Sequence, residues 1–160
     1  MSKSISKYFS IILLLFVTAT SCGQKTFKEM ADDMAANKAP IVQLDAIDSS
    51  VVLLDCRARD EYDVSHIPGA IWVGDDIKAV DGFDKNKKYI VYCSVGYRSG
   101  KYAEKMNDKG FSNAFNLWGG IFHFINSGNK VVDADGITDK VHPYNEKWGK
   151  WLMKGVKSYE

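Results

Sequence analysis

The stretch Tyr89–Ser99, with the sequence YIVYCSVGYRS, determines the fold that we expect for this chain. Its first four residues are β-branched or aromatic, which is typical of a buried strand, and Cys93 stands where that strand ends. From Ser99 onward, helical spacing places three residues on one face: Tyr102, Ala103 and Met106. The pattern predicts a strand, a tight loop and a helix, with Cys93 at the sheet edge where open α/β sheets bind ligands.

Cys93 is the candidate nucleophile of this loop. The thiolate is the reactive form of cysteine, and it is favoured by the N–H groups of a helix amino terminus and by a nearby cation. Arg98 supplies the cation. Gly96 can adopt the positive φ that a curled loop requires, so that successive N–H groups turn inward and form an anion-binding nest. We therefore expect the backbone to hold an anion carried on Cys93.

Residues 93–98 form a Cys-x4-Arg loop, and on this loop the sequence resembles the rhodanese family of sulfurtransferases. Three other segments agree with the resemblance: VVLLDCR at 51–57, Glu61-Tyr62 followed by HIPGA at 66–70, and LWGG at 117–120. The resemblance covers residues 40–127. It implies an α/β fold, a rhodanese-like open parallel sheet of about five strands with helices on both faces.

The same resemblance implies a reaction. Cys93 would accept a sulfane sulfur as a persulfide and pass it to a nucleophilic acceptor. The residues implied to form the site are Cys93 with the loop Ser94, Val95, Gly96, Tyr97, Arg98 and Ser99, supported by Asp55 and Arg57. The implied partners are a small sulfur donor, thiosulfate or a persulfide, and a thiol or cyanide-like acceptor, with no metal or organic cofactor. Arg98 is the only cation in the loop, which does not favour thiosulfate as the natural donor.

Two other functions remain open at this point. A sulfur-carrier or binding module would hold the persulfide for a partner without turnover, and the sequence hardly distinguishes it from an enzyme. A phosphatase or arsenate reductase would also use a cysteine loop. Such relatives have five residues between cysteine and arginine, whereas Cys93 and Arg98 are separated by four, which suits a smaller group.

The strand at 51–54 is followed by three residues with distinct expectations. Asp55 is expected to accept hydrogen bonds from loop N–H groups or to pair with an arginine. Arg57 is expected to form a salt bridge with Glu61 or Asp60 rather than to contact substrate. Cys56 is expected to pack in the core. Its alternatives are a disulfide and a resolving thiol that attacks a persulfide on Cys93.

His66 is the one histidine that lies inside a motif. His66 is expected to fix the turn at Pro68 by hydrogen bonds rather than to act as a general base. Short strands are expected at 41–44, 70–73 and 111–118, with a helix at 121–127.

The amino terminus is interpreted as an export signal. Lys3 and Lys7 precede the apolar run Ile11–Val17, and small residues lead to Cys22. This resembles a bacterial lipoprotein signal, in which Cys22 would become the acylated first residue. We therefore expect a signal peptide at 1–21, a linker and helix at 22–39, and a lipoprotein anchored to a membrane on the periplasmic side of the cell envelope. Simple secretion is the alternative.

Composition is that of one globular domain. The chain has 160 residues, of which 46% are hydrophobic and 26% charged. Without the first 21 residues it keeps nineteen basic and twenty acidic side chains, so nothing suggests a nucleic-acid surface.

The tail at 128–160 lies outside the resemblance and is expected to be an extension with an amphipathic helix. Asp133–Gly136 hints at a calcium loop but lacks the other ligands, so a plain turn is expected. Trp148, Trp151 and Leu152 have helical spacing within 144–153 and are flanked by lysines. We expect them to pack against the domain; the alternative is a helix lying on the membrane.

Overall fold

The computed structural model of this chain describes residues 25–160. The expected signal peptide at 1–21 and the acylated Cys22 lie outside the described residues, so both stay predictions. Within 25–160, no helix is long and apolar enough to cross a bilayer.

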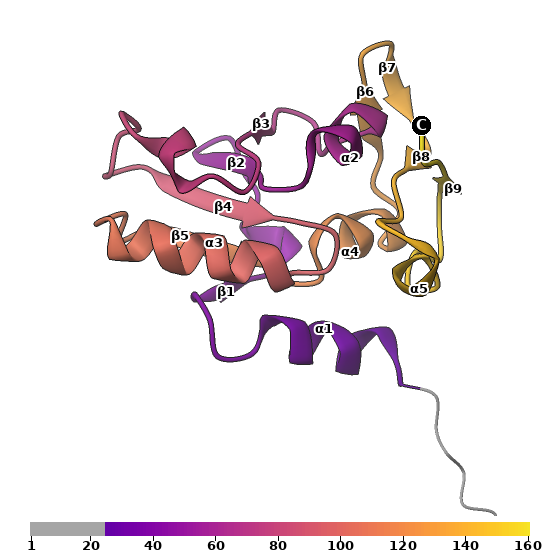
Figure 1. The fold of residues 1–160 in the computed structure, drawn as a ribbon, viewed down its shortest axis with the longest axis horizontal. Helices are drawn as coiled ribbons and strands as arrows, with labels where there is room; N and C mark the ends of the chain where they lie inside the picture. The colour runs from indigo at the N-terminus through magenta and orange to yellow at the C-terminus, as the bar shows by residue number, and fades with distance from the viewer. Residues whose placement is uncertain (1–24) are drawn as a thin grey trace, which may run out of the picture.

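The centre of the molecule is a five-stranded parallel sheet with the order β1-β5-β4-β2-β3. The strands are β1 (Ile41–Val42), β2 (Val51–Asp55), β3 (Ile71–Trp72), β4 (Lys88–Tyr92) and β5 (Ala114–Leu117). β4 is the middle strand, paired in register with β2 from Val51 opposite Lys88 to Asp55 opposite Tyr92. Cys93 directly follows this central strand, as predicted (Figure 1).

Helices cover both faces of the sheet, which confirms the expected α/β class. They are α1 (Phe27–Ala35), α2 (Arg59–Val64), α3 (Tyr97–Asp108) and α4 (Gly120–Asn126), with 3-10 turns at Leu44–Ala46 and Ile77–Val80. α1 begins with a capping box, because Thr26 Oγ1 accepts the N–H of Glu29 while the Glu29 carboxylate accepts the N–H of Thr26.

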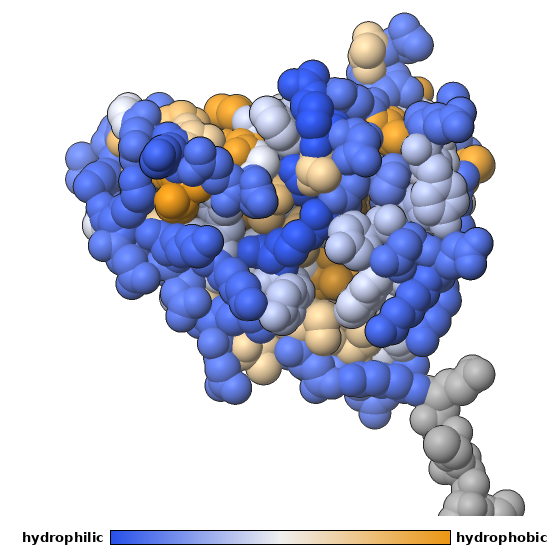
Figure 2. Space-filling model, in the orientation of Figure 1, coloured by the Kyte–Doolittle hydropathy of each residue, from blue (hydrophilic) through white to orange (hydrophobic). Residues whose placement is uncertain are grey.

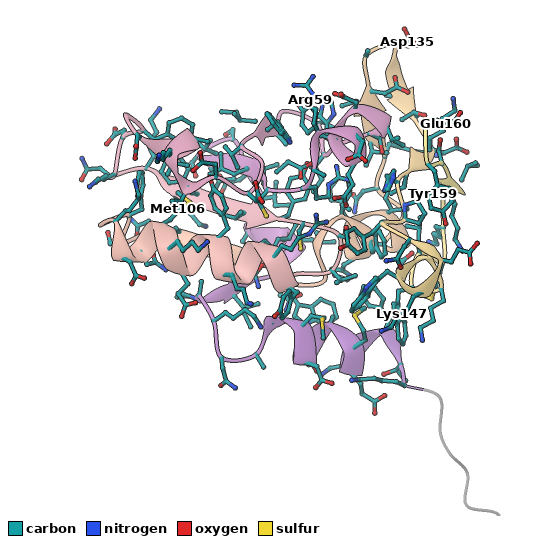
Figure 3. All side chains as sticks on the ribbon, viewed as in Figure 1. Arg59, Met106, Asp135, Lys147, Tyr159 and Glu160 are labelled. Carbon is teal, nitrogen blue, oxygen red and sulfur yellow. The ribbon has the colours of Figure 1, made fainter. Side chains whose placement is uncertain are left out.

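The core forms two layers because successive side chains of a strand point to opposite faces. Along β4, Ile90 and Tyr92 pack with α1 and α4, whereas Tyr89 and Val91 pack with α3. The three residues predicted to share one face of α3 are all buried in the second layer, and Met106 points from α3 toward the sheet (Figure 3). The continuous apolar run of the central strand thus contributes side chains to both layers, as expected for a parallel sheet covered on both sides.

The tail forms an extension that is more irregular than predicted. It contains β6 (Val131–Asp133), β7 (Gly136–Thr138), β8 (Lys140–Val141), α5 (Glu146–Gly149) and β9 (Val156–Lys157). β6 and β7 make an antiparallel hairpin, and β8 pairs with β9 in parallel. Figure 1 shows the extension, coloured orange to yellow, gathered at the end of the sheet toward which β4 points.

The prediction of an amphipathic helix over 144–153 is therefore wrong about the length of that helix. Only Glu146–Gly149 is helical, and Tyr144 has a φ of 65°, which places it outside the helix. Packing against the domain is confirmed, because Leu152 is buried in the core layer with α4, and Trp148 and Trp151 lie against it. The plain turn expected at Asp133–Gly136 is confirmed by the β6–β7 hairpin.

Candidate active site

Cys93 lies at the carboxyl end of β4, at the bottom of a cavity of about 280 Å³. The side chain is only 1% exposed, yet it forms part of the cavity wall. Its sulfur accepts the N–H of Gly96 at 3.2 Å, and the Ser99 hydroxyl lies 3.4 Å away. Cys93 therefore forms part of the pocket wall, and a backbone amide is directed at its sulfur.

The loop turns into α3 through Gly96, which has a φ of 95°. The positive φ predicted for this glycine is confirmed. The helix starts at Tyr97 rather than at Ser99, because the left-handed Gly96 lets its carbonyl accept the N–H of Gly100 at 3.2 Å. The first-turn N–H groups of Tyr97, Arg98 and Ser99 thus have no acceptor within the helix and are available to an anion beside Cys93.

Asn116, in the middle of β5, fixes the back of the loop. Its Nδ2 donates to the carbonyl of Gly96 at 2.9 Å, and its Oδ1 accepts the Ser99 hydroxyl at 2.7 Å. Ser99 has a single hydroxyl proton. The shorter contact indicates that the hydroxyl donates this proton in a hydrogen bond to Asn116 Oδ1. The hydroxyl oxygen is then free to accept from the Cys93 thiol when the thiol is protonated.

The amino terminus of α4 fixes the front of the loop. The N–H of Ile121 donates to the carbonyl of Cys93 at 2.9 Å, and the N–H of Phe122 donates to the carbonyl of Ser94 at 3.1 Å. α4 begins directly after Gly119, which has a φ of 68°. The two glycines of the LWGG motif thus allow the backbone of α4 to approach the loop that holds Cys93.

Arg98 is held by Glu61 rather than pointing freely to the pocket. Its two terminal nitrogens donate to the two oxygens of Glu61 at 2.6 and 2.7 Å, and Nη2 also reaches the Ser94 hydroxyl at 3.0 Å. Ser94 Oγ donates to Glu61 at 3.0 Å. Glu61 itself is only 2% exposed, so a buried carboxylate links α2 to both ends of the loop.

The charges of this group are strongly coupled. Burial alone raises the pKa of Glu61, but the hydrogen bonds and charge of Arg98 outweigh it, so that the pKa lies below its usual value. Burial lowers the pKa of Arg98. The hydrogen bonds to Glu61, and next the charge of Cys93, raise this pKa by more than burial lowers it, so Arg98 stays charged.

Replacing Glu61 by glutamine is expected to lower the free energy of unfolding by about 2 kcal/mol at pH 7. The effect is smaller than for a fully buried ion pair because the Arg98 side chain is part-exposed and solvent screens its charge. The lowered pKa of Glu61 means that its contribution is complete well above 4.5, the usual value, and is lost as the pH falls through the folded-state pKa. Urea unfolding should therefore show the gap between wild type and Glu61→Gln shrinking from pH 7 to pH 3.5.

Asp81→Asn is the control for this prediction, because Asp81 pairs with Lys109 on the exposed surface. It should change stability by less than about 0.5 kcal/mol. An equal gap for Glu61→Gln at both pH values would contradict the assignment of the effect to the ion pair.

Arg57 pairs with Asp55, not with Glu61 or Asp60 as the sequence suggested. Arg57 Nε and Nη2 donate to the Asp55 carboxylate at 2.7 to 3.1 Å, and both side chains have no exposed surface. Glu61 is already taken by Arg98, and Asp55 is the nearest carboxylate inside the protein. Arg57 is not among the residues that line the pocket at Cys93, and its guanidinium lies 5.8 Å from the ring of Tyr92, the residue before Cys93. Of the two partners expected for Asp55, the arginine is the correct one.

Cys56 and Cys93 are both free, so the alternative of a disulfide is wrong. Cys56 is buried in the same core layer as α3, as expected for a packing role. Its sulfur donates to the carbonyl of Tyr92 at 3.3 Å. Burial, and next the charge of Cys93, raise the pKa of Cys56 well above its usual value, which keeps it protonated and disfavours a resolving thiol.

His66 does not face the site. Its ring stacks on Tyr62 with the centroids 3.9 Å apart, and its Nδ1 lies 3.2 Å from the carbonyl of Tyr62. The role is structural, as expected, but the hydrogen bonds of His66 go to Tyr62 and to Val132 and not across the turn at Pro68. Among residues 25–160, no group of three or more potential ligands is arranged to hold a metal ion.

The extension completes the pocket above Cys93, which the sequence did not indicate. The pocket is lined by the loop and by two residues of the tail: Cys93, Ser94, Val95, Tyr97, Arg98, Tyr144 and Trp148. Figure 2 shows a hollow on this face, between the regions that Figure 1 labels α3 and α5, with pale residues of intermediate hydropathy around it.

Four residues of the site were thus missed: Glu61, Asn116, Tyr144 and Trp148. Two of them carried a signal. Glu61 belongs to a motif that marked the resemblance, and Asn116 is a single polar residue in the apolar run of 114–117. Tyr144 and Trp148 carried none, because the tail gives no local pattern that places it over the loop.

Comparison with known proteins decides the family. A family model described as a rhodanese-like domain matches residues 26–127, more than half of the chain. The chain belongs to the rhodanese-like domain family. This confirms the resemblance seen on the Cys-x4-Arg loop.

Curated proteins similar to this rhodanese-like chain carry another name. The tRNA uridine(34) hydroxylase of Yersinia enterocolitica is 35% identical over 117 residues, 68% of this chain and 33% of that protein. That of Erwinia tasmaniensis is 33% identical over 135 residues, 79% of this chain and 39% of that protein. The chain spans about a third of the length of these relatives.

Solved structures agree on the fold. A rhodanese-related protein from Thermoplasma volcanium has a TM-score of 0.52 and 26% identity, with 58% of this chain and 97% of that one covered. The rhodanese-like domain of an Anabaena protein has a TM-score of 0.55 at 19% identity, with 59% and 79% covered, and shows the fold alone.

Proposed function

We propose that this rhodanese-like chain is a sulfurtransferase that carries a sulfane sulfur as a persulfide on Cys93. The observation that best supports this proposal is the position of the Cys93 sulfur. Cys93 Sγ accepts the Gly96 N–H at the amino terminus of α3, and Cys93 and Arg98 line the same pocket. Both the thiolate and the persulfide are anions, and both are stabilised by such N–H groups and by the cation.

The reaction has two displacements. In the first, the Cys93 thiolate attacks the outer sulfur of the donor; a new S–S bond forms, the donor's own bond to that sulfur breaks, and the leaving group departs with the electron pair. In the second, a nucleophilic acceptor attacks the terminal sulfur, the bond between it and Cys93 breaks, and the thiolate is restored. No proton has to be transferred when both reactants are anions.

Two other functions are less well supported. A phosphatase or arsenate reductase needs a cradle for a tetrahedral oxyanion, and the four residues between Cys93 and Arg98, with Arg98 held by Glu61, leave little room and little free charge. We do not extend tRNA hydroxylation from the relatives' name to this chain, because the match covers about a third of those proteins, and residues 25–160 carry nineteen basic against twenty acidic side chains.

We propose in addition that the chain is exported and anchored to a membrane of the cell envelope through an acylated Cys22, on the evidence of the sequence at 1–22. Intact-mass measurement of the protein extracted from its own membranes tests this. A chain that starts at Cys22 and carries the mass of a lipid supports it, and an unmodified chain that starts at Met1 contradicts it.

The test of the main proposal is intact-mass analysis after brief incubation with a sulfane-sulfur donor. We expect the wild type and Cys56→Ser to gain the mass of one sulfur atom, since Cys56 is a buried thiol outside the pocket. Cys93→Ser should gain nothing. An adduct that persists in Cys93→Ser would refute the assignment.

The same assay separates an enzyme from a carrier. When cyanide or a thiol is added with excess donor, an enzyme releases product over many cycles. A carrier transfers one sulfur for each chain and then stops. We expect multiple turnovers, and a single turnover with every acceptor would favour the carrier.

A further inference from the structure

Two aromatic residues of the extension form the wall of the pocket opposite the Cys93 loop. Tyr144 and Trp148 line the cavity together with Val95 and Tyr97 of the loop. Both lie outside residues 26–127, the part matched by the family model. This part of the pocket is therefore contributed by residues of this chain's own tail and not by the matched domain.

Tyr144 is held in place by an unusual backbone. Its φ is 65°, a region that bulky residues rarely adopt and that persists only where the surrounding structure fixes it. The N–H of Tyr144 donates to the ring of His142 at 3.1 Å, and His142 is buried. The ring of Tyr144 lies 4.9 Å from the guanidinium of Arg98. The strained residue thus sets an aromatic ring against the charged end of the active-site loop.

The pocket offers little uncompensated positive charge. Arg98 is the one cationic side chain among the residues that line it, and both oxygens of Glu61 already bind it. Lys38 and Lys101 lie 4.7 and 4.6 Å from the ring of Tyr97, outside the lining of the cavity. A donor with two negative charges would enter a pocket whose single cation is already paired with Glu61 and whose walls are mostly aromatic and aliphatic.

We propose that Tyr144 and Trp148 select the sulfur donor: the pocket takes a small organic sulfane-sulfur compound with a single negative charge and an apolar or aromatic group, in preference to thiosulfate. This rests on the proposed sulfurtransferase function and names its substrate class. The cavity volume of about 280 Å³ is close to the lower limit of about 300 Å³ for ordinary ligand sites, which suits a molecule of this size.

Three donors with the same reacting group test the proposal: thiosulfate, methanethiosulfonate and benzenethiosulfonate. In each, the Cys93 thiolate attacks the terminal sulfur, and the bond from that sulfur to the oxidised sulfur breaks with its electron pair. Thiosulfate releases sulfite, and the thiosulfonates release a sulfinate. Thiosulfate and methanethiosulfonate differ in charge, whereas the two thiosulfonates have equal charge and differ in the apolar group.

The measurement is the second-order rate constant of persulfide formation on the full chain, divided by that of a free thiolate with the same donor. This ratio removes the intrinsic reactivity of each donor. We expect benzenethiosulfonate to be preferred over methanethiosulfonate by about tenfold through contact with the two rings, and methanethiosulfonate to be preferred over thiosulfate.

Variants of the wall decide whether these residues cause the preference. Tyr144→Gly removes the ring and also relieves the backbone strain, and it should abolish most of the preference for the phenyl donor. Tyr144→Phe retains the ring and should keep the preference for the phenyl donor. Trp148→Phe should give an intermediate value. Lys147→Ala is the control, because Lys147 is an exposed neighbour on α5 that does not line the pocket (Figure 3).

Failure of this proposal is distinct from failure of the proposed function. If Tyr144→Gly keeps the wild-type preference, or if thiosulfate is the best donor of the wild type, the selection by the extension is wrong, although persulfide still forms on Cys93. If no donor yields an adduct that depends on Cys93, the sulfurtransferase proposal falls as well.

Discussion

Replacing Asp55 by alanine is expected to lower the free energy of unfolding by about 3–5 kcal/mol, because it leaves a buried guanidinium without its counter-ion. Arg57 has no exposed surface, and Asp55 neutralises it through three hydrogen bonds from side-chain nitrogens. The Asp55 carboxylate also accepts the backbone N–H of Arg57 at 3.0 Å. Urea unfolding at pH 7 measures the change.

Among the described residues, Asp55 is the one salt-bridge partner of Arg57. Arg57 Nη2 also donates to the carbonyl of Ser65 at 2.6 Å, and Nη1 has no partner among the described residues. Burial lowers the pKa of Arg57, but the charge and hydrogen bonds of Asp55 raise it by more, so the side chain stays charged in the folded protein. An uncompensated charge in this position is far more costly than a lost surface contact.

Asp63→Ala is the matched control. Asp63 also pairs with an arginine, Arg59, at 2.8 Å, but both side chains are more than half exposed. Its removal should cost no more than about 0.5 kcal/mol. The double variant Asp55→Ala/Arg57→Leu should recover much of the loss, since it removes the charge with its partner. Equal effects of Asp55→Ala and Asp63→Ala would contradict the role of burial.

The sheet and the loop could be predicted because local patterns determine them. The apolar run before Cys93 has to be buried on both faces, which requires a covered parallel strand. Gly96 is the residue of the loop that adopts a positive φ without strain, and its φ of 95° follows from that freedom. Thr26 and Glu29 form their capping box within four residues of chain. In each case the interacting groups are close in sequence.

The charged pairs could not be predicted in the same way. Glu61 and Arg98 are 37 residues apart in sequence, and they meet only because β2 and β4 are neighbours and both end at the same edge of the sheet. The sequence offered Arg57 two nearby carboxylates at Asp60 and Glu61, but burial turned it to Asp55. Such choices depend on which side chains the fold excludes from water, and this is not visible in a local pattern.

The tail shows the same limit more strongly. Its aromatic residues suggested one long amphipathic helix, whereas the structure breaks the segment at Tyr144 and keeps four helical residues. Trp148 lies partly against the core and partly along the pocket, so one residue serves packing and lines the site. Only the tertiary arrangement brings residues 144–148 to Cys93.

Replacing Gly120 by alanine is expected to lower the free energy of unfolding by about 3–4 kcal/mol, from the cost of a left-handed non-glycine residue together with overpacking. Gly120 has a φ of 56°, and a Cβ atom there would lie 2.2 Å from the carbonyl oxygen of Cys93 and 2.9 Å from the carbonyl carbon and oxygen of Ser94. These are backbone atoms, which cannot rotate away as a flexible side chain would.

The same substitution should slow persulfide formation by about a hundredfold, because a displacement of about 1 Å at a reacting atom has an effect of this size. The clash is with the peptide groups that carry Cys93 and Ser94, and the N–H groups of Ile121 and Phe122 bind the same two carbonyls. The loop has to move away from α4, and the sulfur moves with it relative to the Gly96 amide.

Gly82→Ala is the control, since Gly82 has a φ of 90° and no atom within 4 Å of the position of a Cβ. It carries the backbone strain without the clash, and it should cost about 1–2 kcal/mol without affecting the rate of persulfide formation. Intact-mass time courses and urea unfolding on both variants separate the two effects. If Gly120→Ala forms persulfide as fast as Gly82→Ala, the contact between α4 and the loop does not position Cys93.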